Sequence, residues 1–457
     1  MTTAYDICII GAGQAGPPLA HAAAKAGRRV VLIERKHLGG SCVNFGCTPT
    51  KAAIASARVA HVTRRAREFG VRVPSVDIDF KAVLDRAKRI VAQSRDSLER
   101  GFRDTDNPKL IHGHAQLAGR DGERFRIDIG GETLTATQVV LDTGTRTSVP
   151  SIDGVDNIAF LDADHWLEHE ELPRHLLIVG GGYVGLEMSQ FYRRMGARVT
   201  VAHGHAQLAE REDADVAEAL QRVLEGEGIT FLLGRKAKRF EKTATGIRTT
   251  LDGHGGEQQI ESSHVFLAVG RTPNTDDLGL DTVGVKLSAK GIVEVDARLA
   301  TNIPGIWAAG DIRGGAMFTH TAWDDYRILA AQLFGDGDRT TDRVIPYAIF
   351  TDPELGRVGM TERQARDQGK QVRVGRFELR DNGKARELGE TSGSCKVVID
   401  ADSRQILGAA VLAVEGAELV HVYVDLMNAR ARVDVLRDAI HIHPTLAEAL
   451  QSAVAEL

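Results

Sequence analysis

Two cysteines that lie five residues apart are the part of this sequence best suited to redox chemistry. Cys42 and Cys47 stand in the run GGSCVNFGCTPTK, residues 39–51. A thiolate is the reactive form of cysteine, and a pair that cycles between dithiol and disulfide stores two electrons, the number that a hydride delivers. Four cysteines among 457 residues are too few for a scaffold of structural disulfides. We therefore interpret Cys42 and Cys47 as a redox-active pair, and Cys8 and Cys395 as small buried residues.

A glycine-rich loop near the N-terminus has the spacing of a dinucleotide-binding loop. Gly11, Gly13 and Gly16 follow an apolar run at residues 5–10. Such a loop turns sharply, lets the backbone approach a pyrophosphate, and starts a helix whose N-terminus favours negative charge. Glu34 ends the next expected strand, about 20 residues on, where a carboxylate can accept both ribose hydroxyls of an adenosine. The segment therefore predicts a first dinucleotide site.

A second copy of this loop occurs later in the chain. Its glycines are Gly180, Gly182 and Gly185. At the position that corresponds to Glu34, the second copy has His203 in place of an acid. A site selective for NADH would favour an acid there, whereas His203 and His205 could donate to the 2′-phosphate of NADPH. Polar residues that merely end a strand are an equally consistent interpretation. The sequence predicts a site for NADPH or NADH and slightly favours NADPH.

The cysteine run resembles the redox-active segment of the flavoprotein disulfide reductases, the family of glutathione reductase, dihydrolipoyl dehydrogenase and mercuric reductase. Further motifs of that family follow in its order along essentially the whole chain. They are Thr143-Gly144, GGGYVGLE (180–187), VGRTPN (269–274), Ala309-Gly310-Asp311 and HPTLAE (443–448). The resemblance implies an FAD-dependent oxidoreductase that uses NADH or NADPH and works as a homodimer.

The resemblance also assigns roles near the flavin. It implies that Cys47 faces the flavin as the charge-transfer thiol and that Cys42 is the interchange thiol that attacks the acceptor. It pairs Lys51 with Glu187 beside the flavin nitrogen that receives the hydride, where a cation stabilises the reduced flavin. Tyr183 is implied to cover the flavin until the nicotinamide displaces it. The other implied cofactor contacts are Ser41, Thr143, Gly144, Gly270, Arg271, Asp311 on the ribityl-phosphate side, and the backbone of His114 and Ala115 at the adenine.

His443 and Glu448 are implied to reach the cysteines from the other subunit. A carboxylate that holds an imidazole lets it take a proton from a departing thiol and return it. Catalysis would then require the homodimer. His441 and His443 have a spacing that metal ligands can have, but two histidines without further ligands do not indicate a metal site. We therefore predict no metal site.

The full-length match is nearest to the mercuric-reductase-like branch of the family. The stretches FTHTAWDDYR (318–327) and FTDPELGRVGM (350–360) indicate that branch. Mercuric reductases carry an extra C-terminal cysteine pair, and no cysteine follows Cys395 here. The expected acceptor is therefore a small disulfide, a quinone or a soft metal ion.

Two alternatives to this function stay open. Dihydrolipoyl dehydrogenase is favoured by the intact pair of His443 and Glu448 and disfavoured by His203. A redox sensor or electron carrier that signals to a partner protein is the alternative from another class. The acid–base pair disfavours a sensor, which has no need of repeated proton transfer.

The length of the chain suggests roughly two to four domains. We expect an α/β fold with two Rossmann-like dinucleotide-binding domains and a C-terminal α+β dimerisation domain. The expected boundaries are 1–148 and 270–338 for the discontinuous FAD-binding domain, 149–269 for the NAD(P)-binding domain and 339–457 for the dimerisation domain. Local patterns predict a helix over residues 80–102, an antiparallel ribbon over 124–141 and a helix over 416–431.

Composition narrows the choice of partners and compartment. The formal charge of −5 gives no basic footprint for nucleic acid or an anionic membrane. No apolar run approaches the ~20 residues that cross a bilayer, so we expect no membrane span. The N-terminus has none of the features of a secretory signal, so we expect a cytoplasmic protein that acts on a small-molecule acceptor.

Overall fold

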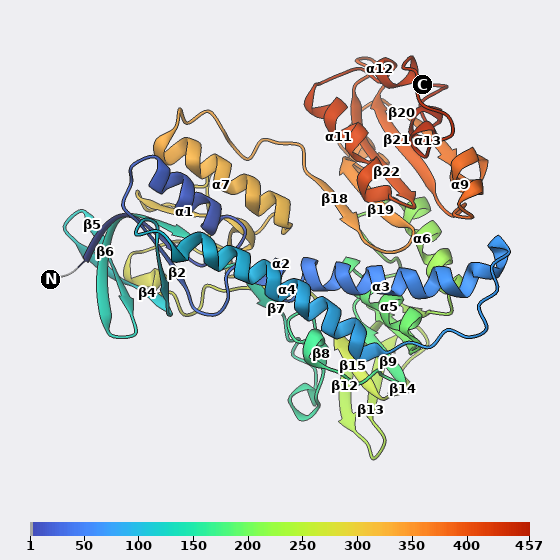
Figure 1. The fold of residues 1–457 in the computed structure, drawn as a ribbon, viewed down its shortest axis with the longest axis horizontal. Coiled ribbons are helices and arrows are strands. Elements are labelled where there is room, and N and C mark those ends of the chain that lie inside the picture. The colour runs from blue at the N-terminus through green and yellow to red at the C-terminus, as the bar shows by residue number, and fades with distance from the viewer. Residues whose placement is uncertain (1–2) are drawn as a thin grey trace.

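The structure is a computed structural model, and it describes residues 3–457. Its N-terminal part is a layered α/β unit, at the left of Figure 1, built around a seven-stranded sheet. The strands are β1 (Thr3–Ile10), β2 (Val30–Glu34), β3 (Lys109–His112), β4 (Ala115–Asp121), β5 (Arg124–Ile129), β6 (Glu132–Leu141) and β17 (Ile306–Ala308). They run in the order β3-β2-β1-β6-β5-β4, and β17 also pairs with β6. The antiparallel pairing of β5 with β6 confirms the ribbon predicted over residues 124–141.

Helices α1 (Gly16–Lys25) and α7 (Thr319–Phe334) pack together on one face of this sheet (Figure 1). Leu19 and Ala20 of α1 share a buried core with Ile328 and Leu329 of α7. Small and branched apolar side chains fill this layer because they bury surface without stranding polar groups. The packing joins the start of the chain to a segment 300 residues later, and both helices begin at the same end of the sheet as the cysteine run.

The cysteine run leads into two long helices that link the first sheet to the rest of the molecule. The elements are α2 (Gly40–Asn44), α3 (Cys47–Arg65), the 3₁₀ turn η1 (Ala66–Phe69) and α4 (Phe80–Arg103). Phe80, Leu84, Ala87 and Val91 are buried at helical spacing, which accounts for the predicted helix over residues 80–102. Alanines line the buried face of α3, so α4 and α5 approach it closely.

The second α/β unit contains a five-stranded parallel sheet in the order β11-β10-β9-β15-β8. Its strands are β8 (Leu161–Asp162), β9 (His175–Val179), β10 (Arg198–His203), β11 (Thr230–Leu233) and β15 (His264–Leu267). Its helices are α5 (Tyr183–Met195) and α6 (Ala214–Gly226). An antiparallel sheet adds β12 (Arg235–Lys242), β13 (Ile247–Gly253) and β14 (Gln258–Ser262). The 3₁₀ turns η2 (Val155–Asn157) and η3 (Trp166–Glu168) precede β9.

A two-stranded antiparallel ribbon connects the first unit to the second, with one strand on the way out and the other on the return. Strand β7 (Thr145–Thr147) leaves the first unit, and β16 (Arg271–Pro273) pairs with it antiparallel on the return. The 3₁₀ turns η4 (Leu280–Thr282) and η5 (Gly310–Arg313) flank β17, which rejoins the first sheet beside β6.

The C-terminal unit is an antiparallel sheet with helices. Its strands, in the order β18-β19-β22-β21-β20, are β18 (Pro346–Ile349), β19 (Glu354–Gly359), β20 (Val372–Glu378), β21 (Ser394–Asp400) and β22 (Ile406–Ala413). The helical elements are α8 (Glu362–Asp367), η6 (Leu379–Asp381), α9 (Gly383–Glu387), α10 (Gly416–Leu419), α11 (His421–Asn428), α12 (Asp434–Arg437) and α13 (Ala447–Ser452). The single helix predicted over residues 416–431 is thus two short helices, which meet at Val420.

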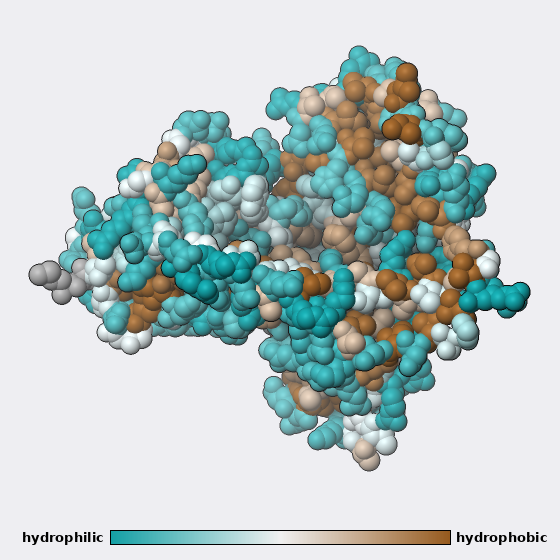
Figure 2. All heavy atoms as spheres, viewed as in Figure 1, coloured by the Kyte–Doolittle hydropathy of each residue, from teal (hydrophilic) through white to brown (hydrophobic). Residues whose placement is uncertain are grey.

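The predicted fold class is confirmed, with two dinucleotide-type α/β units and a C-terminal α+β unit. The domain boundaries stay predictions. Figure 2 shows hydrophobic side chains on the surface of the C-terminal unit, where Val435, Ile440 and Ile442 are exposed. Within residues 3–457, no helix combines the length and apolar character needed to cross a membrane.

Candidate active site

Cys42 and Cys47 lie at the junction of two helices. Cys42 is in α2, and Cys47 is the first residue of α3, where backbone N–H groups without helical partners favour negative charge. A Cβ on Gly40 would lie only 3.0 Å from the Cα of Gly13, so glycine lets this junction touch the first glycine loop. Both thiols are free and half-buried. The structure therefore brings the cysteine run against the loop predicted to hold a dinucleotide.

The two thiols differ in how readily they lose a proton. Hydrogen bonding with Cys42, aided by Thr319 and the charge of Lys51, outweighs burial and lowers the pKa of Cys47 to about 6. The same hydrogen bond, together with burial, raises the pKa of Cys42 far above its ordinary value. Near neutral pH the reduced pair therefore holds Cys47 as thiolate and Cys42 as thiol.

Lys51 and Glu187 form an ion pair beside the cysteines. Lys51 lies one turn beyond Cys47 on α3, and its Nζ is 2.8 Å from Oε2 of Glu187 on α5. Oε1 of Glu187 accepts a hydrogen bond from the backbone N–H of Phe350 at 2.9 Å, and Nζ of Lys51 lies 4.5 Å from the centre of the Phe350 ring. Burial alone would lower the pKa of Lys51, but Glu187 outweighs it and raises that pKa. Lys51 is therefore held as a cation next to the reactive thiols.

The first glycine loop leaves a backbone cradle at the start of α1. Gly11 has a φ of +99°, and a Cβ there would lie 2.3 Å from the carbonyl oxygen of Asp142. A Cβ on Gly16 would lie 2.5 Å from the carbonyl oxygen of Gly11. Oε2 of Glu34 accepts a hydrogen bond from the N–H of Ala12 at 2.8 Å, so the carboxylate stands at the edge of the loop. A backbone free of side chains at a helix N-terminus, with an acid beside it, fits the dinucleotide FAD.

The segments predicted to contact FAD converge on this loop. The N–H of Gly113, just before His114 and Ala115, donates to the carbonyl oxygen of Glu34 at 2.9 Å. His114 itself turns its Nε2 toward the carbonyl oxygen of Asp277, 2.9 Å away. The backbone of this segment therefore lies beside the acid expected at the adenosine end.

Thr143, Gly144 and Asp311 are tied to neighbouring segments by hydrogen bonds just beyond the end of β6. Oγ1 of Thr143 donates to the carbonyl oxygen of Asn274 at 2.9 Å, and the N–H of Asn274 donates to the carbonyl oxygen of Gly144. Oγ1 of Thr145 donates to Oδ2 of Asp311 at 3.0 Å. Burial raises the pKa of Asp311 despite that hydrogen bond. These contacts tie β7 to the turn η5, and the two residues before β7 to Asn274.

The second glycine loop has the same construction as the first. A Cβ on Gly180 would lie 2.3 Å from the carbonyl oxygen of Ala268, and one on Gly185 would lie 2.0 Å from the carbonyl oxygen of Gly180. Gly182 is the N-cap of α5. Tyr183 opens that helix, and its ring centre lies 5.9 Å from that of Phe318. The loop therefore offers a second backbone cradle, with an aromatic side chain at its mouth.

Gly270 and Arg271 lie at the ribbon between the two units. Gly270 adopts a φ of +123° just before β16. The guanidinium of Arg271 donates to Oγ1 of Thr145 at 2.7 Å and faces Asp164 at 3.4 Å. In this structure Arg271 therefore joins β16 to β7 by contacts within the chain.

His443 and Glu448 lie together but apart from the cysteines of the same chain. Nδ1 of His443 is 3.0 Å from Oε1 of Glu448, whose Oε2 accepts the N–H of Thr445 at 2.8 Å. The side chain of His443 is 77% exposed. Figure 1 places α13, which carries Glu448, at the right of the C-terminal unit and α2 near the middle of the molecule.

Comparison with known families accounts for nearly the whole chain. Residues 5–325 match the pyridine nucleotide-disulphide oxidoreductases, and residues 345–454 match the dimerisation domain of that family. The chain belongs to this family. It is therefore an oxidoreductase of a flavoprotein class that uses FAD and a pyridine nucleotide, and it carries the dimerisation domain of the family.

Relatives with several names match almost end to end. The dihydrolipoyl dehydrogenase of Cupriavidus necator is 32% identical, over 99% of this chain and 98% of its own. The mercuric reductase of Streptomyces lividans is 34% identical, over 99% and 96%. A copper(II) complex of the HOCl-induced flavoprotein disulfide reductase RclA from Escherichia coli superposes with a TM-score of 0.89 at 32% identity, over 100% of this chain and 99% of that one. These relatives span both the reductases and the dehydrogenases of the family.

Three residues that contact the site were not among those predicted from the sequence. Oγ1 of Thr319 lies 3.1 Å from Sγ of Cys47. Nε1 of the buried Trp166 donates to the carbonyl oxygen of Phe45, which sits between the two cysteines, at 2.9 Å. Oδ2 of the buried Asp142 accepts the N–H of Gly16 at 2.7 Å. Asp142 had a local cue because it directly precedes Thr143-Gly144, and Thr319 had one because it lies in the 318–327 stretch, whereas Trp166 had none.

Ser41 shapes the turn between the two cysteines through its backbone. Its carbonyl oxygen accepts the N–H of Gly46 at 2.6 Å and the N–H of Phe45 at 3.0 Å. A Cβ on Gly46 would lie 3.1 Å from the same oxygen. The turn is therefore tight, and it delivers Cys47 to the first position of α3.

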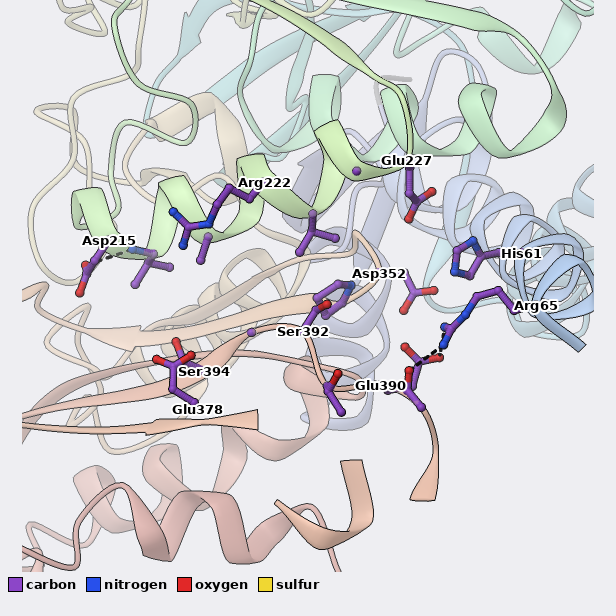
Figure 3. Close-up of a pocket in the computed structure, with 18 of the residues that line it drawn as sticks. His61, Arg65, Asp215, Arg222, Glu227, Asp352, Glu378, Glu390, Ser392 and Ser394 are labelled. Atoms are coloured by element: carbon purple, nitrogen blue, oxygen red, sulfur yellow. Dashed lines mark hydrogen bonds and ion pairs between the residues drawn. The ribbon is translucent and has the colours of Figure 1, made fainter. Parts of the chain in front are cut away.

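A cavity of about 790 Å³ lies elsewhere in the molecule, between α3, α6 and the C-terminal sheet (Figure 3). Buried charges surround it: Arg194 lies 2.7 Å from both Glu227 and Asp352. None of the predicted site residues is among those that line it. We therefore interpret it as a charged joint between the second unit and the C-terminal unit.

Proposed function

We propose that this protein is an FAD-dependent NAD(P)H oxidoreductase that relays electrons through the Cys42–Cys47 disulfide to a small disulfide, a quinone or a soft metal ion. The observation that carries the proposal is the different placement of the two thiols: Cys47 opens α3, 3.1 Å from Oγ1 of Thr319 and one turn from the Lys51–Glu187 ion pair, whereas Cys42 lies in α2. A relay needs one thiolate that stays beside the cofactor and a second thiol that reacts with the acceptor.

The residues around the pair support a two-electron relay. FAD, when bound in the first glycine cradle, supplies the carrier that takes a hydride from the nicotinamide. Lys51, held as a cation by Glu187, stabilises negative charge as it develops beside Cys47. The disulfide gains two electrons and one proton, which leaves a thiolate at Cys47 and a thiol at Cys42.

Transfer to the acceptor then depends on Cys42. Loss of its proton generates the nucleophile that attacks a disulfide or binds a soft metal ion. We propose that His443 of the partner subunit, oriented by Glu448, takes this proton. Within one chain His443 and Glu448 lie away from the cysteines. The protein is accordingly proposed to act as a homodimer, in the cytoplasm.

Copper(II) is a specific candidate for the metal ion. The related RclA of Escherichia coli is described as a copper(II) complex. Two thiols that cycle with the nicotinamide could each give one electron to Cu²⁺ and form Cu⁺, which thiolates bind well. The metal would then be a substrate that leaves the site.

Dihydrolipoyl dehydrogenase is the second candidate, favoured by the 3.0 Å contact of His443 with Glu448. Steady-state assays of the purified holoenzyme separate the two. NADH or NADPH is supplied with Cu²⁺, a quinone or a small disulfide, and dihydrolipoamide is supplied with NAD⁺ or NADP⁺. Faster turnover with the first set supports the proposal. Rapid oxidation of dihydrolipoamide, with none of the first set reduced, would replace it with the dehydrogenase.

A further inference from the structure

The loop after β10 places the carboxylate of Glu210 beside His203, the last residue of that strand. Oε1 of Glu210 lies 3.1 Å from Nε2 of His203 and 3.5 Å from Nε2 of His205. The end of β10 is the position at which an NADH-selective site has its acid. The histidines therefore do not stand alone at this end of the second sheet, because a carboxylate from a later residue reaches them.

The second glycine loop fixes the orientation of His203. The N–H of Gly181 donates to Nδ1 of His203 at 3.1 Å. A Cβ on Gly181 would lie 2.9 Å from Cγ of that ring, so the imidazole packs directly against the loop. Since Nδ1 accepts this hydrogen bond, the proton of the neutral ring is on Nε2, which faces Glu210. Burial lowers the pKa of His203 although Glu210 opposes that change, which favours the neutral ring.

Glu210 keeps the capacity to accept hydrogen bonds from a ligand. Nε2 of His203 is within ion-pair distance of the carboxylate, but the two groups are not aligned as a hydrogen bond. The side chain of Glu210 is 46% exposed, and that of His203 is 9% exposed. The carboxylate therefore lies against a buried ring beside the glycine loop and is open on its outer side.

A carboxylate at this place discriminates between the two nicotinamide nucleotides. It can accept hydrogen bonds from the 2′- and 3′-hydroxyls of the adenosine ribose of NADH. It repels the 2′-phosphate of NADPH, and the neutral His203 does not compensate that repulsion. Two nearby cations could serve a phosphate: Lys236, whose Cγ would lie 3.0 Å from a Cβ on Gly204, and Arg211, whose charge reaches Tyr183.

We infer that Glu210, which lies beside His203 and His205 at the end of β10, selects NADH over NADPH. The inference rests on the proposed function, because it needs this loop to bind the nicotinamide nucleotide. It points in the opposite direction to the NADPH preference that His203 suggested in the sequence. Glu210 lies in the loop after β10, so the residues at the end of that strand do not by themselves predict its role.

The test compares both nucleotides on the oxidised holoenzyme and three variants. Glu210→Gln removes the charge at constant size, Glu210→Arg reverses it, and Glu218→Gln removes an exposed carboxylate of α6 as the matched control. Two readouts are taken: the second-order rate constant for stopped-flow reduction of the oxidised enzyme by NADH and by NADPH, and the Kd of NAD⁺ and NADP⁺ by calorimetry.

We expect the wild type and Glu218→Gln to prefer NADH by about tenfold or more in both readouts. Glu210→Gln should lower the ratio by about tenfold, and Glu210→Arg should favour NADPH. A wild-type preference for NADPH, or a ratio that Glu210→Gln leaves within about twofold, would overturn the inference. Equal use of both nucleotides would end only this inference, whereas failure of both to reduce the enzyme would end the proposed function itself.

Discussion

The hydroxyl oxygen of Thr319 lies 3.1 Å from the Sγ of Cys47, so the first residue of α7 touches the first residue of α3. The two helices are far apart in the sequence. Their contact puts a hydrogen-bond donor on the thiol whose pKa is lowered to about 6. The thiolate at Cys47 therefore depends on packing across the N-terminal unit as well as on its neighbour Cys42.

Replacement of Thr319 by Val should raise the pKa of Cys47. Loss of one hydrogen bond to a charged group corresponds to about one pH unit, so the thiolate fraction at pH 7 should fall from about nine-tenths to about half. Thr319→Ser keeps the hydroxyl and should behave like the wild type. The pH dependence of alkylation of the reduced enzyme measures the pKa. Identical titrations for the Val and Ser variants would rule out this role for Thr319.

Replacement of Glu187 by Gln should make hydride transfer sensitive to alkaline pH. Gln keeps an acceptor for the N–H of Phe350 but removes the charge that raises the pKa of Lys51. Burial then lowers that pKa, so Lys51 loses its proton earlier as the pH rises. Stopped-flow reduction by the nicotinamide should slow by about tenfold and fall further above neutral pH. The surface carboxylate variant Glu170→Gln serves as the control, and a flat, wild-type profile in Glu187→Gln would contradict the assignment.

A mixture of two inactive variants should recover activity if the site is shared between subunits. Cys42→Ser removes the interchange thiol, and His443→Gln removes the acid–base group. In a hybrid dimer one site carries both defects and the other carries neither, so random reassembly should restore about one quarter of wild-type turnover. Reassembled homodimers of each variant are the controls. No recovery in a mixture shown to contain hybrids would mean that His443 acts within its own chain or not at all.

Replacement of Arg194 by Met should destabilise the joint between the second unit and the C-terminal unit. Arg194 is 4% exposed and lies between Asp352 and Glu227, as Figure 3 shows for the two carboxylates. Removal of the cation leaves the buried Glu227 without a charged partner and leaves Asp352 with Arg58 alone, which should lower the free energy of unfolding by about 3 kcal/mol. Arg222→Met, at an exposed arginine beside the same cavity, should cost less than about 0.5 kcal/mol.

The stability lost on replacement of Arg194 by Met should decrease as the pH falls. Burial would raise the pKa of Asp352, but Arg194 and Arg58 outweigh it and lower that pKa. The stabilising contribution is therefore present above the unfolded pKa of about 4 and is lost as the pH falls through the folded value. The stability difference between Arg194→Met and the wild type should shrink in denaturant titrations below about pH 4. A difference that is constant with pH would show that the ion pair is not its source.

Much of the site was predictable because its reactive and cofactor-binding residues occur in short sequence motifs. The two glycine loops, the cysteine run and the order of the motifs predicted two dinucleotide-type units, and the contact of Lys51 with Glu187 was expected from the resemblance. Periodicity also predicted α4 closely. Such signals depend on neighbours along the chain, so a single sequence contains them.

Features made by contacts between distant segments were not predictable. Thr319 reaches Cys47, Trp166 holds Phe45, and Glu210 reaches His203 only after the chain has folded. The break of the predicted 416–431 helix at Val420, which is buried in one core with residues of β19 and β22, likewise had no local pattern to mark it.

Differential labelling of the four cysteines tests the redox pair most directly. The holoenzyme is alkylated anaerobically before and after reduction by the nicotinamide, and modified residues are identified by mass spectrometry. We expect Cys42 and Cys47 to resist labelling in the oxidised enzyme and to label together after reduction, while the buried Cys8 and Cys395 stay unlabelled throughout. Equal labelling of Cys42 and Cys47 before and after reduction would contradict the relay through this pair.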